Sequence, residues 1–548
     1  MSAAMRIVNG KVYDPANNID GEIKDICIKD GKIVDSVDDD AIVINAQGMV
    51  IMPGGVDIHC HIAGPKVNAA RKLQPEDHRH DVHPGTPFTR SGTGGTVPST
   101  FATGYRYATL GYTTAMEAAV TPIGARHTLE EFHDTPVIDK GFYVLLGENI
   151  FLQNLLREKR MEEFDQAVAW WVNATKAYTV KLVNPGGDEP WKGKKNSNVS
   201  DIDEKTDEGL SPREIIEAFI VSVNKQGFPH PPHIHCNNLG HSGNYKTTLE
   251  TMKTAGDMRA HIAHIQFHSY GGELGKNPVS KAAEIVEYVD NHPNITCDVG
   301  QVMFGKSTIM TADAPLAYVL KGHTKGKWVN ADTECESGCG IVPFQYQEHV
   351  YMHTLQWAIG LEIFLLSKDP WRVILSTDHP NGGSFMNYPK LIKLLMDKSF
   401  RHEEMKRVNQ KALANCSLRD LEREFTLNEI AIITRAGPAR ALGLSNKGHL
   451  GNGADADITI YDEMEDKEMM FNAPRYVIKS GHAIIDNHEF KTDFIGKLLH
   501  ISPEYDKKIE EVVQPFFESY YSIEFSNYAV DDSYLHDHEI IQTGNAKA

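Results

Sequence analysis

Hydrophobic and polar positions alternate in two different ways along the chain. In about the first fifty residues, short β-type runs are separated by turn signals, an Asn-Gly pair in MRIVNGKVYD and an Asp-Gly pair in DICIKDGKIVDSV. From residue 53 to residue 446, apolar strand-like runs alternate with amphipathic helical segments such as SPREIIEAFIVSVNKQG. This alternation predicts repeated βα units, which form a parallel sheet and close naturally into a β/α barrel.

The β pattern returns after the barrel segment, in HLGNGADADITIYD and RYVIKSGHAIID. We therefore expect residues 1–52 and 447–500 to combine into one small β-sandwich beside the barrel of residues 53–446. Residues 501–548 mix aromatic and acidic side chains, which is typical of an arm that docks onto a neighbouring protein.

Two segments, 65–99 and 186–211, are rich in Gly, Pro, Lys and Asp and are long for connections in a compact domain. They predict active-site loops, partner-binding insertions or plain surface loops, and the sequence leaves these alternatives open.

Composition limits the compartment and the partners. The formal net charge of −19 argues against nucleic acid or an anionic membrane surface as a partner. No run of about 18 apolar residues occurs, and MSAAMRIVNGKVYD lacks the apolar core of a signal peptide, so we expect a cytoplasmic protein without a membrane span. Seven scattered cysteines fit reduced thiols, and Cys335 and Cys339 have the wrong spacing for a zinc knuckle.

Candidate chemistry begins in GGVDIHCHIAG, where Asp57, His59 and His61 alternate with apolar residues. A period of two predicts a strand, in which residues two apart are separated by about 6.6 Å and can bind one ion. The chain holds 26 histidines, however, and chance gives roughly one His-x-His pair where four occur. A metal pair and two hydrogen-bonded core histidines thus stay open from this segment alone. The pairs His78/His80 and His536/His538 lie in polar surroundings that predict solvated loops.

Other predicted strands end in similar residues further along the chain. Functional groups of a β/α barrel lie at the C-terminal ends of its strands. In chain order, those ends supply Lys181 in AYTVKLVNPGG, His233 and His235 in PHIHCNN, His264 and His268 in AHIAHIQFHSYGG, and Asp378 in WRVILSTDHPNGG. This series predicts one metal site built from separate strands.

Lys181 needs a specific explanation, because its neighbours Val180 and Leu182 place it on the inward face. An ammonium among histidine ligands loses its hydration and is repelled by a bound cation. Carboxylation of the amine by carbon dioxide removes both problems, because the carbamate has two oxygens that can bridge two metals.

This ordered set resembles the amidohydrolase superfamily, whose first strand ends in His-x-His, fourth in a carboxylated lysine, fifth and sixth in histidines and eighth in aspartate. The flanks VINAQGMVIMPGGVDIHCH and GHLGNGADADITIYD are similar as well. The resemblance implies a TIM-like (β/α)8 barrel with two Zn²⁺ or other divalent ions and a catalytic Asp378. The implied metal ligands are His59, His61, Lys181, His235, His264 and Asp378.

Several roles stay open within this resemblance. His233 and His235 share parity, and His235 is preferred because it matches the family's run with Asn237. His268 is a candidate for contacting substrate or orienting a ligand, or else a core histidine, and His261 on the opposite face is expected to be structural. Arg71, Arg79 and Arg106 are candidates for binding substrate carboxylates, or else structural arginines.

The stretches TFATGYRYATLGYTTAMEAAVTP, HCNNLGHSGNYKTTLE and GLEIFLLSKDPWRVILSTDHPNGG resemble the amidohydrolase-type subunits of formylmethanofuran dehydrogenases. That resemblance implies condensation of formate with the amine of methanofuran, a reversible formamide hydrolysis, in methanogenic fixation of carbon dioxide. It implies partner subunits that carry a tungsten or molybdenum pterin and iron-sulfur clusters, with neither in this chain. A bacterial relative acts as a formyl hydrolase. The alternatives are a stand-alone cyclic-amide hydrolase of hydantoinase or dihydroorotase type and a metal-free assembly scaffold.

Overall fold

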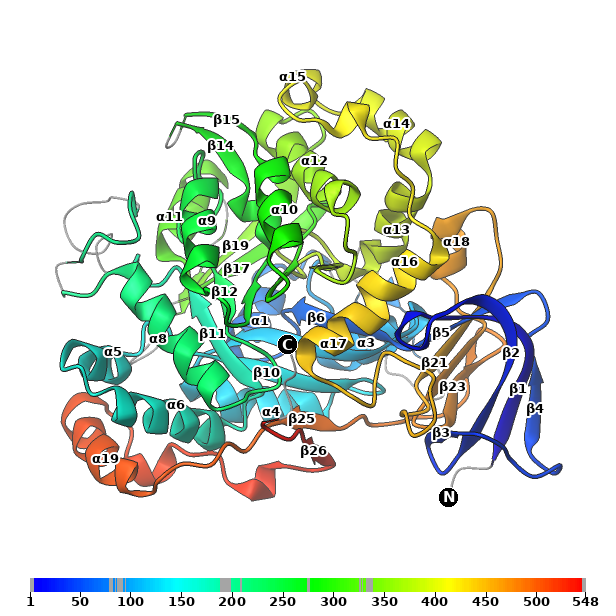
Figure 1. Ribbon diagram of the computed structural model, residues 1–548, viewed down its shortest axis with the longest axis horizontal. Coiled ribbons are helices and arrows are strands. Elements are labelled where there is room, and N and C mark those ends of the chain that lie inside the picture. Colours follow the sequence, from blue (N-terminus) through cyan, green and yellow to red (C-terminus); the bar gives the residue numbers. More distant parts are fainter. Residues whose placement is uncertain are drawn as a thin grey trace.

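The computed structural model describes residues 4–544 apart from 78–81, 84, 86–91, 94, 188–198, 207–208, 274–275, 325–326, 328 and 332–338. A central barrel is surrounded by helices, and a separate sheet lies at one end of the molecule beside the N-terminus (Figure 1). None of the helices in this described part is long and apolar enough to cross a membrane.

Eight parallel strands form the barrel within the described residues, and their spatial order follows the chain. They are β6 (Gly55–Cys60), β9 (Tyr112–Val120), β10 (Asp139–Leu145), β11 (Thr179–Val183), β12 (His233–His235), β13 (Ala260–Ile262), β16 (Ile295–Asp298) and β20 (Val373–Ile374). Each strand pairs in parallel with the next. A parallel bridge from Cys60 to His379 closes the ring between the first strand and the end of the eighth. The predicted barrel is confirmed.

Helices follow the strands along the chain and cover the outside of the barrel (Figure 1). Helix α8 illustrates how the sequence starts them, because Ser211 and Glu214 form a capping box and Pro212 occupies the first turn. Its apolar positions then recur at helical spacing and are buried. The bounds are α3 (Thr100–Thr109), α4 (Ala125–His133), α5 (Ile150–Arg157), α6 (Met161–Thr175), α8 (Pro212–Lys225), α9 (Tyr245–Thr254), α10 (Ala282–Asn291), α12 (Tyr351–Leu366), α13 (Tyr388–Met396), α14 (Lys398–Arg407), α15 (Gln410–Leu413), α16 (Leu427–Ala431), α17 (Gly437–Leu442) and α18 (Lys467–Phe471).

The N-terminal and C-terminal segments form one hydrogen-bonded sheet, as predicted for the small β unit. Its strands are β1 (Met5–Asp14), β2 (Ile19–Lys29), β3 (Lys32–Val34), β4 (Ile42–Asn45), β5 (Met49–Pro53), β21 (Ile458–Asp462), β22 (Tyr476–Lys479), β23 (His482–Asp486) and β24 (Glu489–Phe490). Strand β1 pairs with β4 along its first half and with β5 along its second half. Strand β5 pairs with β21, so segments from the two ends of the chain share one apolar core that includes Ile7, Ile51 and Ile458. The domain boundaries given above stay predictions.

An insertion between the seventh and eighth barrel strands lies over the barrel mouth. It comprises β17 (Gly305–Thr311), α11 (Ala314–Thr324), β18 (Val329–Ala331) and β19 (Cys339–Tyr346), with the three strands in one antiparallel sheet. Helix α1 (Pro65–Leu73) packs against this sheet. The sequence pattern did not separate this insertion from the βα repeats. Two short hairpins lie outside these sheets, β7 (Val82–His83) with β8 (Gly92–Thr93) and β14 (Tyr270–Glu273) with β15 (Lys276–Ser280).

The C-terminal arm lies against the barrel of its own chain. Strand β25 (Leu498–His500) pairs with β10 and with β26 (His538–Ile540), and helix α19 (Lys508–Tyr520) lies beside α6. Phe517 is fully buried, and Phe525 stacks on Trp170 at 5.5 Å between ring centroids. Part of the aromatic surface that we assigned to a partner is therefore covered within the chain. Docking of a partner by this arm stays a prediction.

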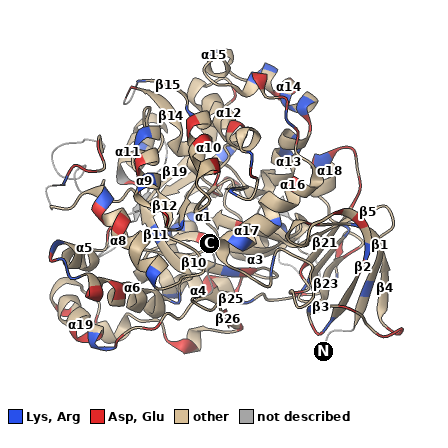
Figure 2. Ribbon diagram, viewed as in Figure 1, with Lys and Arg blue, Asp and Glu red and all other residues tan. Residues whose placement is uncertain are grey.

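Acidic and basic side chains are spread over the outer helices, and both signs occur on α8 and α14 (Figure 2). The excess of acidic residues is therefore not confined to one helix. A mixed surface of this kind favours solubility.

Candidate metal centre

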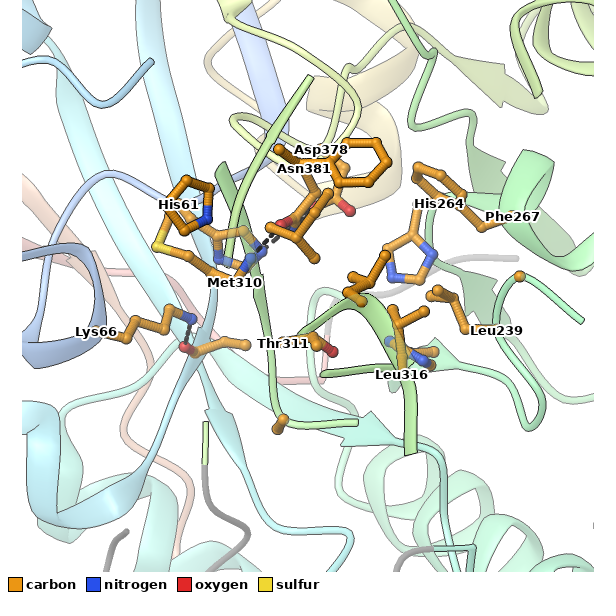
Figure 3. Close-up of a pocket in the computed structure, with 18 of the residues that line it drawn as sticks. His61, Lys66, Leu239, His264, Phe267, Met310, Thr311, Leu316, Asp378 and Asn381 are labelled. Carbon is orange, nitrogen blue, oxygen red and sulfur yellow. Dashed lines mark hydrogen bonds and ion pairs between the residues drawn. The ribbon is translucent and has the colours of Figure 1, made fainter. Parts of the chain in front are cut away.

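The predicted ligands gather at one cavity of about 990 Å³ at the C-terminal ends of the barrel strands. Figure 3 shows His61, His264 and Asp378 around this cavity, with Met310 and Leu316 of the insertion also lining it. All six predicted ligands line it, namely His59, His61, Lys181, His235, His264 and Asp378. Each is at most 5% exposed, so the cluster lies at the buried end of the cavity.

Asp378 connects the first and eighth strands. Its Oδ1 lies 3.0 Å from His59 Nε2 and 3.2 Å from His61 Nε2, and it accepts a hydrogen bond from Asn381 Nδ2 at 3.0 Å. Asp378 has a left-handed φ of 50°, and Ser376 Oγ accepts a hydrogen bond from its backbone N–H. The surrounding contacts thus hold a conformation that is uncommon for a residue other than glycine.

Two buried carboxylates orient the histidines of the first strand. Glu117 on β9 lies 2.8 Å from His61 Nδ1, and Asp298 on β16 lies 3.1 Å from His59 Nδ1. Each carboxylate accepts a hydrogen bond from the Nδ1–H and leaves Nε2 free to bind a metal, as is common for metal-bound histidines. Neither carboxylate was predicted from the sequence. The available signal was one acidic residue within an apolar strand, in AMEAAV and in ITCDVG.

The charges of this region depend on one another. Burial alone would raise the pKa of Glu117, yet Lys66 and His61 together with its hydrogen bonds hold it at about 2. Burial alone would lower the pKa of His59, yet Asp298 and Asp378 raise it to about 9. His59 therefore carries a positive charge next to Asp378 when no cation is bound, and a metal ion can take the place of that proton.

Lys181 is 2% exposed and its Nζ has no hydrogen-bond partner among the described residues. Burial lowers the pKa of this amine to about 8, so its neutral, nucleophilic form is accessible. Buried polar groups in native proteins are normally paired. This orphaned amine fits a group that is modified or that faces a bound ion.

The histidines at the ends of the fifth and sixth strands also have ring nitrogens without hydrogen-bond partners among the described residues. His235, His264 and His268 each bring one ring nitrogen within 4.8 Å of the others. Within the described part of the chain, His264 Nδ1 and both nitrogens of His268 lack hydrogen-bond partners. His235 Nε2 lies 3.3 Å from Asp313 Oδ2, but without the geometry of a hydrogen bond. Burial lowers the pKa of all three, which keeps the imidazoles neutral and able to donate a lone pair. These groups fit a divalent metal.

Other predicted site residues do not line the cavity. His233 lies one layer deeper in the barrel and contacts His59 Nδ1 at 2.9 Å. Asn237 ties two loops together by donating to Asn184 Oδ1 and to the Pro185 carbonyl. Arg106 is buried on α3 away from the cavity. Arg71 donates to Glu131 and to the Ile62 and Pro98 carbonyls, which makes it structural.

The remaining sequence predictions have mixed outcomes. His261 is structural in its contacts, since it bonds Thr296 and Asp298 away from the cavity. His536 and His538 are exposed, although His538 belongs to β26. His78, His80, Arg79 and Cys335 lie outside the described residues. Of the two long segments, the first contributes Pro65, Lys66 and Asp77 to the cavity, whereas much of the second lies outside the described residues.

The walls of the cavity have two characters. The insertion and the loops after β12 and β13 supply apolar side chains, including Leu239, Phe267, Ile309, Met310, Leu316 and Phe344. Ionisable groups from the segment around α1 and from β17 line another part, among them Lys66, Glu76, Asp77 and Lys306. This combination suits a ligand with an apolar body and polar ends.

Comparisons with known proteins agree with this geometry. Residues 42–485 match the model of the Amidohydrolase family. The chain is 43% identical to protein FwdA of Methanocaldococcus jannaschii, over 98% of both chains. It is 38% identical to FhcA of the formyltransferase/hydrolase complex Fhc of Methylorubrum extorquens, over 96% of both. The crystal structure of that complex, FhcABCD, with methylofuran contains a chain that superimposes with a TM-score of 0.92 at 36% identity, covering 98% of this chain and 99% of that one.

The similarity to these relatives extends over the small sheet, the barrel, the insertion and the arm. This favours the formylmethanofuran dehydrogenase subunits as relatives over stand-alone cyclic-amide hydrolases. The chain therefore belongs to the amidohydrolase family, in the group that contains FwdA and FhcA.

Proposed function

We propose that this chain is the formamide-forming and formamide-hydrolysing subunit of a formylmethanofuran dehydrogenase. It condenses formate with the amine of methanofuran, and the same site runs the reverse hydrolysis. The observation that carries the proposal is the set of buried nitrogens of Lys181 and His264, which line the cavity, and of His268 next to His264, which lack partners among the described residues. The nearly full-length similarity to FwdA and to FhcA, whose complex was solved with methylofuran, supports the substrate class.

The proposed centre contains two divalent ions, for which zinc suits the nitrogen-rich ligand set. His59, His61, His235, His264 and Asp378 would hold them, together with Lys181 carboxylated at Nζ. The lack of any other partner for this amine within the described structure supports its modification. Bound divalent ions supply Lewis acidity toward a formyl or carboxylate oxygen and lower the pKa of water.

Asp378 is the proposed proton carrier. In hydrolysis its carboxylate takes the proton of the attacking water and returns it to the leaving amine, and in synthesis it takes the proton of the attacking amine. The contacts with His59, His61 and Asn381 hold the carboxylate in place. Because one group serves both directions, concentrations of formate and amine decide which way the reaction runs.

Burial of the cluster supports this chemistry. Glu117 and Asp298 fix the rings of His61 and His59, so neither ring has to reorient during reaction. The apolar wall around Met310 and Leu316 excludes water from one side of the cavity. A formamide bound there would meet a preorganised polar centre within an otherwise apolar surface.

Reduction of carbon dioxide belongs to partner subunits in this proposal. The seven cysteines are not grouped with the spacing of iron-sulfur ligands, so the pterin and the clusters would lie on other chains. The exposed side of the C-terminal arm, which includes Tyr520 and Ile540 at about half exposure, is our candidate for docking. The proposed compartment is the cytoplasm.

The test combines metal content with substrate choice. The purified chain should contain two equivalents of divalent metal and hydrolyse formylmethanofuran, but it should not reduce carbon dioxide without partners. Dihydroorotate and hydantoin serve as comparison substrates and should not be hydrolysed at a comparable rate. Hydrolysis of a cyclic amide in preference to the formamide would contradict the proposal, and a chain that binds no metal would point to an assembly scaffold.

A further inference from the structure

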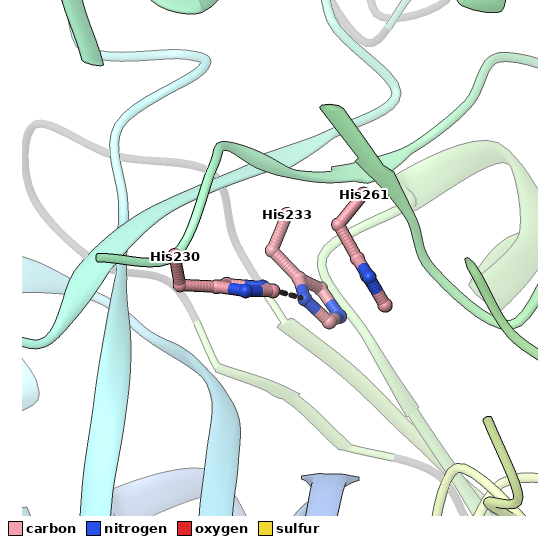
Figure 4. A group of neighbouring side chains, drawn as sticks. All are labelled: His230, His233 and His261. Atoms are coloured by element: carbon pink, nitrogen blue, oxygen red, sulfur yellow. Dashed lines mark hydrogen bonds between the residues drawn. The ribbon is translucent and has the colours of Figure 1, made fainter. Parts of the chain in front are cut away.

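A second layer of histidines lies under the metal centre. His230, His233 and His261 are each fully buried, and Figure 4 shows His230 and His233 linked and His261 beside His233. None of them lines the cavity. His230 precedes β12 by three residues and was not singled out by the sequence pattern.

The hydrogen bonds of this layer have a defined direction. His230 Nδ1 lies 2.7 Å from the carbonyl oxygen of Ala441. A carbonyl can only accept, so Nδ1 of His230 carries the proton. Burial holds the pKa of His230 well below its ordinary value, so the ring is neutral and its Nε2 is a bare acceptor.

The next two bonds follow from the first. His230 Nε2 lies 3.1 Å from His233 Nδ1, which must therefore donate. The carboxylate of Asp298, 3.1 Å from His59 Nδ1, can only accept, so His59 Nδ1 carries a proton and His233 Nε2 beside it is a bare acceptor. His233 Nε2 lies 2.9 Å from His59 Nδ1, which donates in turn. His59 Nε2, which points at Asp378, is then the nitrogen whose lone pair faces the metal centre.

The opposite placement of the protons on His233 and His230 is excluded by the contact between His230 and the Ala441 carbonyl. If His233 carried its proton on Nε2 and donated it to Asp298, 3.5 Å away, its Nδ1 would have to accept from His230. Neutral His230 would then present a bare Nδ1 to the Ala441 carbonyl, placing two acceptors 2.7 Å apart. A carbonyl at the end of the barrel helix α17 thus determines the proton position of a ring at the mouth.

We propose that His230 and His233 are positioning residues, a neutral relay from the Ala441 carbonyl that fixes which nitrogen of His59 is free to bind metal. Asp298 accepts from the same His59 nitrogen at 3.1 Å, but it is shared with His261 and with the His264 backbone N–H. The relay supplies the second acceptor and prevents a donor from facing His59. The inference rests on the proposed function only in taking His59 as a metal ligand.

The experiment compares two substitutions of His230 in the full-length chain. In His230→Gln, the carboxamide oxygen reaches the position of Nε2 and can accept from His233, whereas His230→Leu offers no acceptor. His292→Leu is the matched control, because His292 Nδ1 also lies 2.7 Å from a carbonyl, that of Tyr288, far from the site in sequence. The readouts are the zinc dissociation constant from chelator competition and the visible spectrum of the cobalt-substituted chain.

His230→Leu should weaken zinc binding about 10- to 100-fold, the range for losing an outer partner of a metal ligand, and should alter the cobalt spectrum. His230→Gln should stay within about threefold of the unmodified chain, well below that range, and His292→Leu should not differ from it. Unchanged affinity in His230→Leu overturns the relay. Equal weakening by Leu and Gln also overturns it, because loss of packing alone would then account for both.

A second pair of variants covers the case in which His230→Leu does not fold. His233→Gln places an acceptor beside His59, whereas His233→Asn is one methylene too short, so only Asn should weaken zinc binding. A third zinc equivalent that disappears in these variants would mean that the three histidines bind a metal themselves, and would overturn the relay. Zinc affinity is measured without substrate, so a chain that shows these shifts but hydrolyses no formamide contradicts only the proposed function.

Discussion

Two groups of buried ionisable side chains, at opposite sides of the barrel, differ in how completely they are paired. At the junction with the small sheet, Lys447 Nζ lies 2.6 Å from Asp139, 2.8 Å from Asp455 and 3.2 Å from Asp457. Lys479 Nζ lies 2.5 Å from Asp139 and 2.7 Å from Asp457. Three carboxylates surround two ammonium groups, so every charge has an opposite neighbour.

The barrel mouth has no such balance. Lys181 Nζ, His264 Nδ1 and both nitrogens of His268 have no hydrogen-bond partner among the residues that the structure describes, although all are as deeply buried as the junction. The three aspartates of the junction also satisfy a purely geometric test for a metal site, but lysines already occupy it. Between these two groups, the unpaired buried atoms, and not the mere clustering of ligands, distinguish the candidate site from the ion network.

The largest expected effect is that of Lys181→Ala at the mouth. The variant should lose formamide hydrolysis and at least one of the two proposed metals, because the oxygens of the proposed carbamate would be missing. It should still fold, since the amine makes no hydrogen bond to the described residues that the fold would need. Elemental analysis and circular dichroism check both points. Two metals retained in this variant would contradict the bridging role proposed for Lys181.

At the junction, Lys447→Met should act on stability and not on chemistry. Removing one partner of a buried ion network leaves uncompensated charge and costs about 3–5 kcal/mol. The free energy of unfolding from urea titration checks the cost, and the metal content of the folded fraction should not change. The control is Lys491→Met, whose exposed pair with Glu489 should matter by less than about 1 kcal/mol. A variant as stable as the unmodified chain would mean that the junction charges do not hold the two parts together.

At the barrel mouth, Asp378→Asn should have a smaller effect, which is on the reaction rate. Hydrolysis and synthesis of the formamide should fall together by about 10²-fold, the lower end for loss of a general base. Asp462→Asn, which alters a carboxylate paired with Arg475 in the small sheet, is the control and should leave both rates unchanged. Loss of one direction alone would show that Asp378 is not the shared proton carrier.

The smallest effect is a pH dependence at the junction. Lys140 donates to the Thr135 and Gly496 carbonyls, and burial lowers its pKa to about 7 from an ordinary 10.5. Between these values the unfolded chain binds a proton that the folded chain lacks, so stability rises with pH. From about pH 7.5 to about pH 8.5, one such group contributes about 1 kcal/mol.

Urea unfolding at the two pH values measures this slope, which should be smaller by that amount in Lys140→Met. The same comparison in Lys491→Met should show the full slope, since that lysine is exposed. Identical slopes in Lys140→Met and the unmodified chain would show that Lys140 stays charged in the folded protein.

Local sequence patterns were sufficient to predict the barrel and the order of its candidate ligands along the chain. A period of two placed His59, His61 and Lys181 on the inward faces of strands, and the strand ends followed one another along the chain as they do around the barrel. These features depend on residues close in sequence, which is why they could be predicted. The family resemblance then supplied the roles, which parity alone left open for His233 and His235.

Only the tertiary structure decided what surrounds those ligands. Glu117 reaches His61 across 56 residues, Asp298 reaches His59 across 239, and the Ala441 carbonyl reaches His230 across 211. The tertiary structure also places His233 below the cavity and His235 beside it. Part of the C-terminal arm packs against Trp170 of the same chain. A hydrogen bond between distant strands leaves no period in the sequence, because each partner appears there only as one polar residue in an apolar run. Closure of the barrel brings such residues together, and their pairing then determines which polar atoms remain free for chemistry.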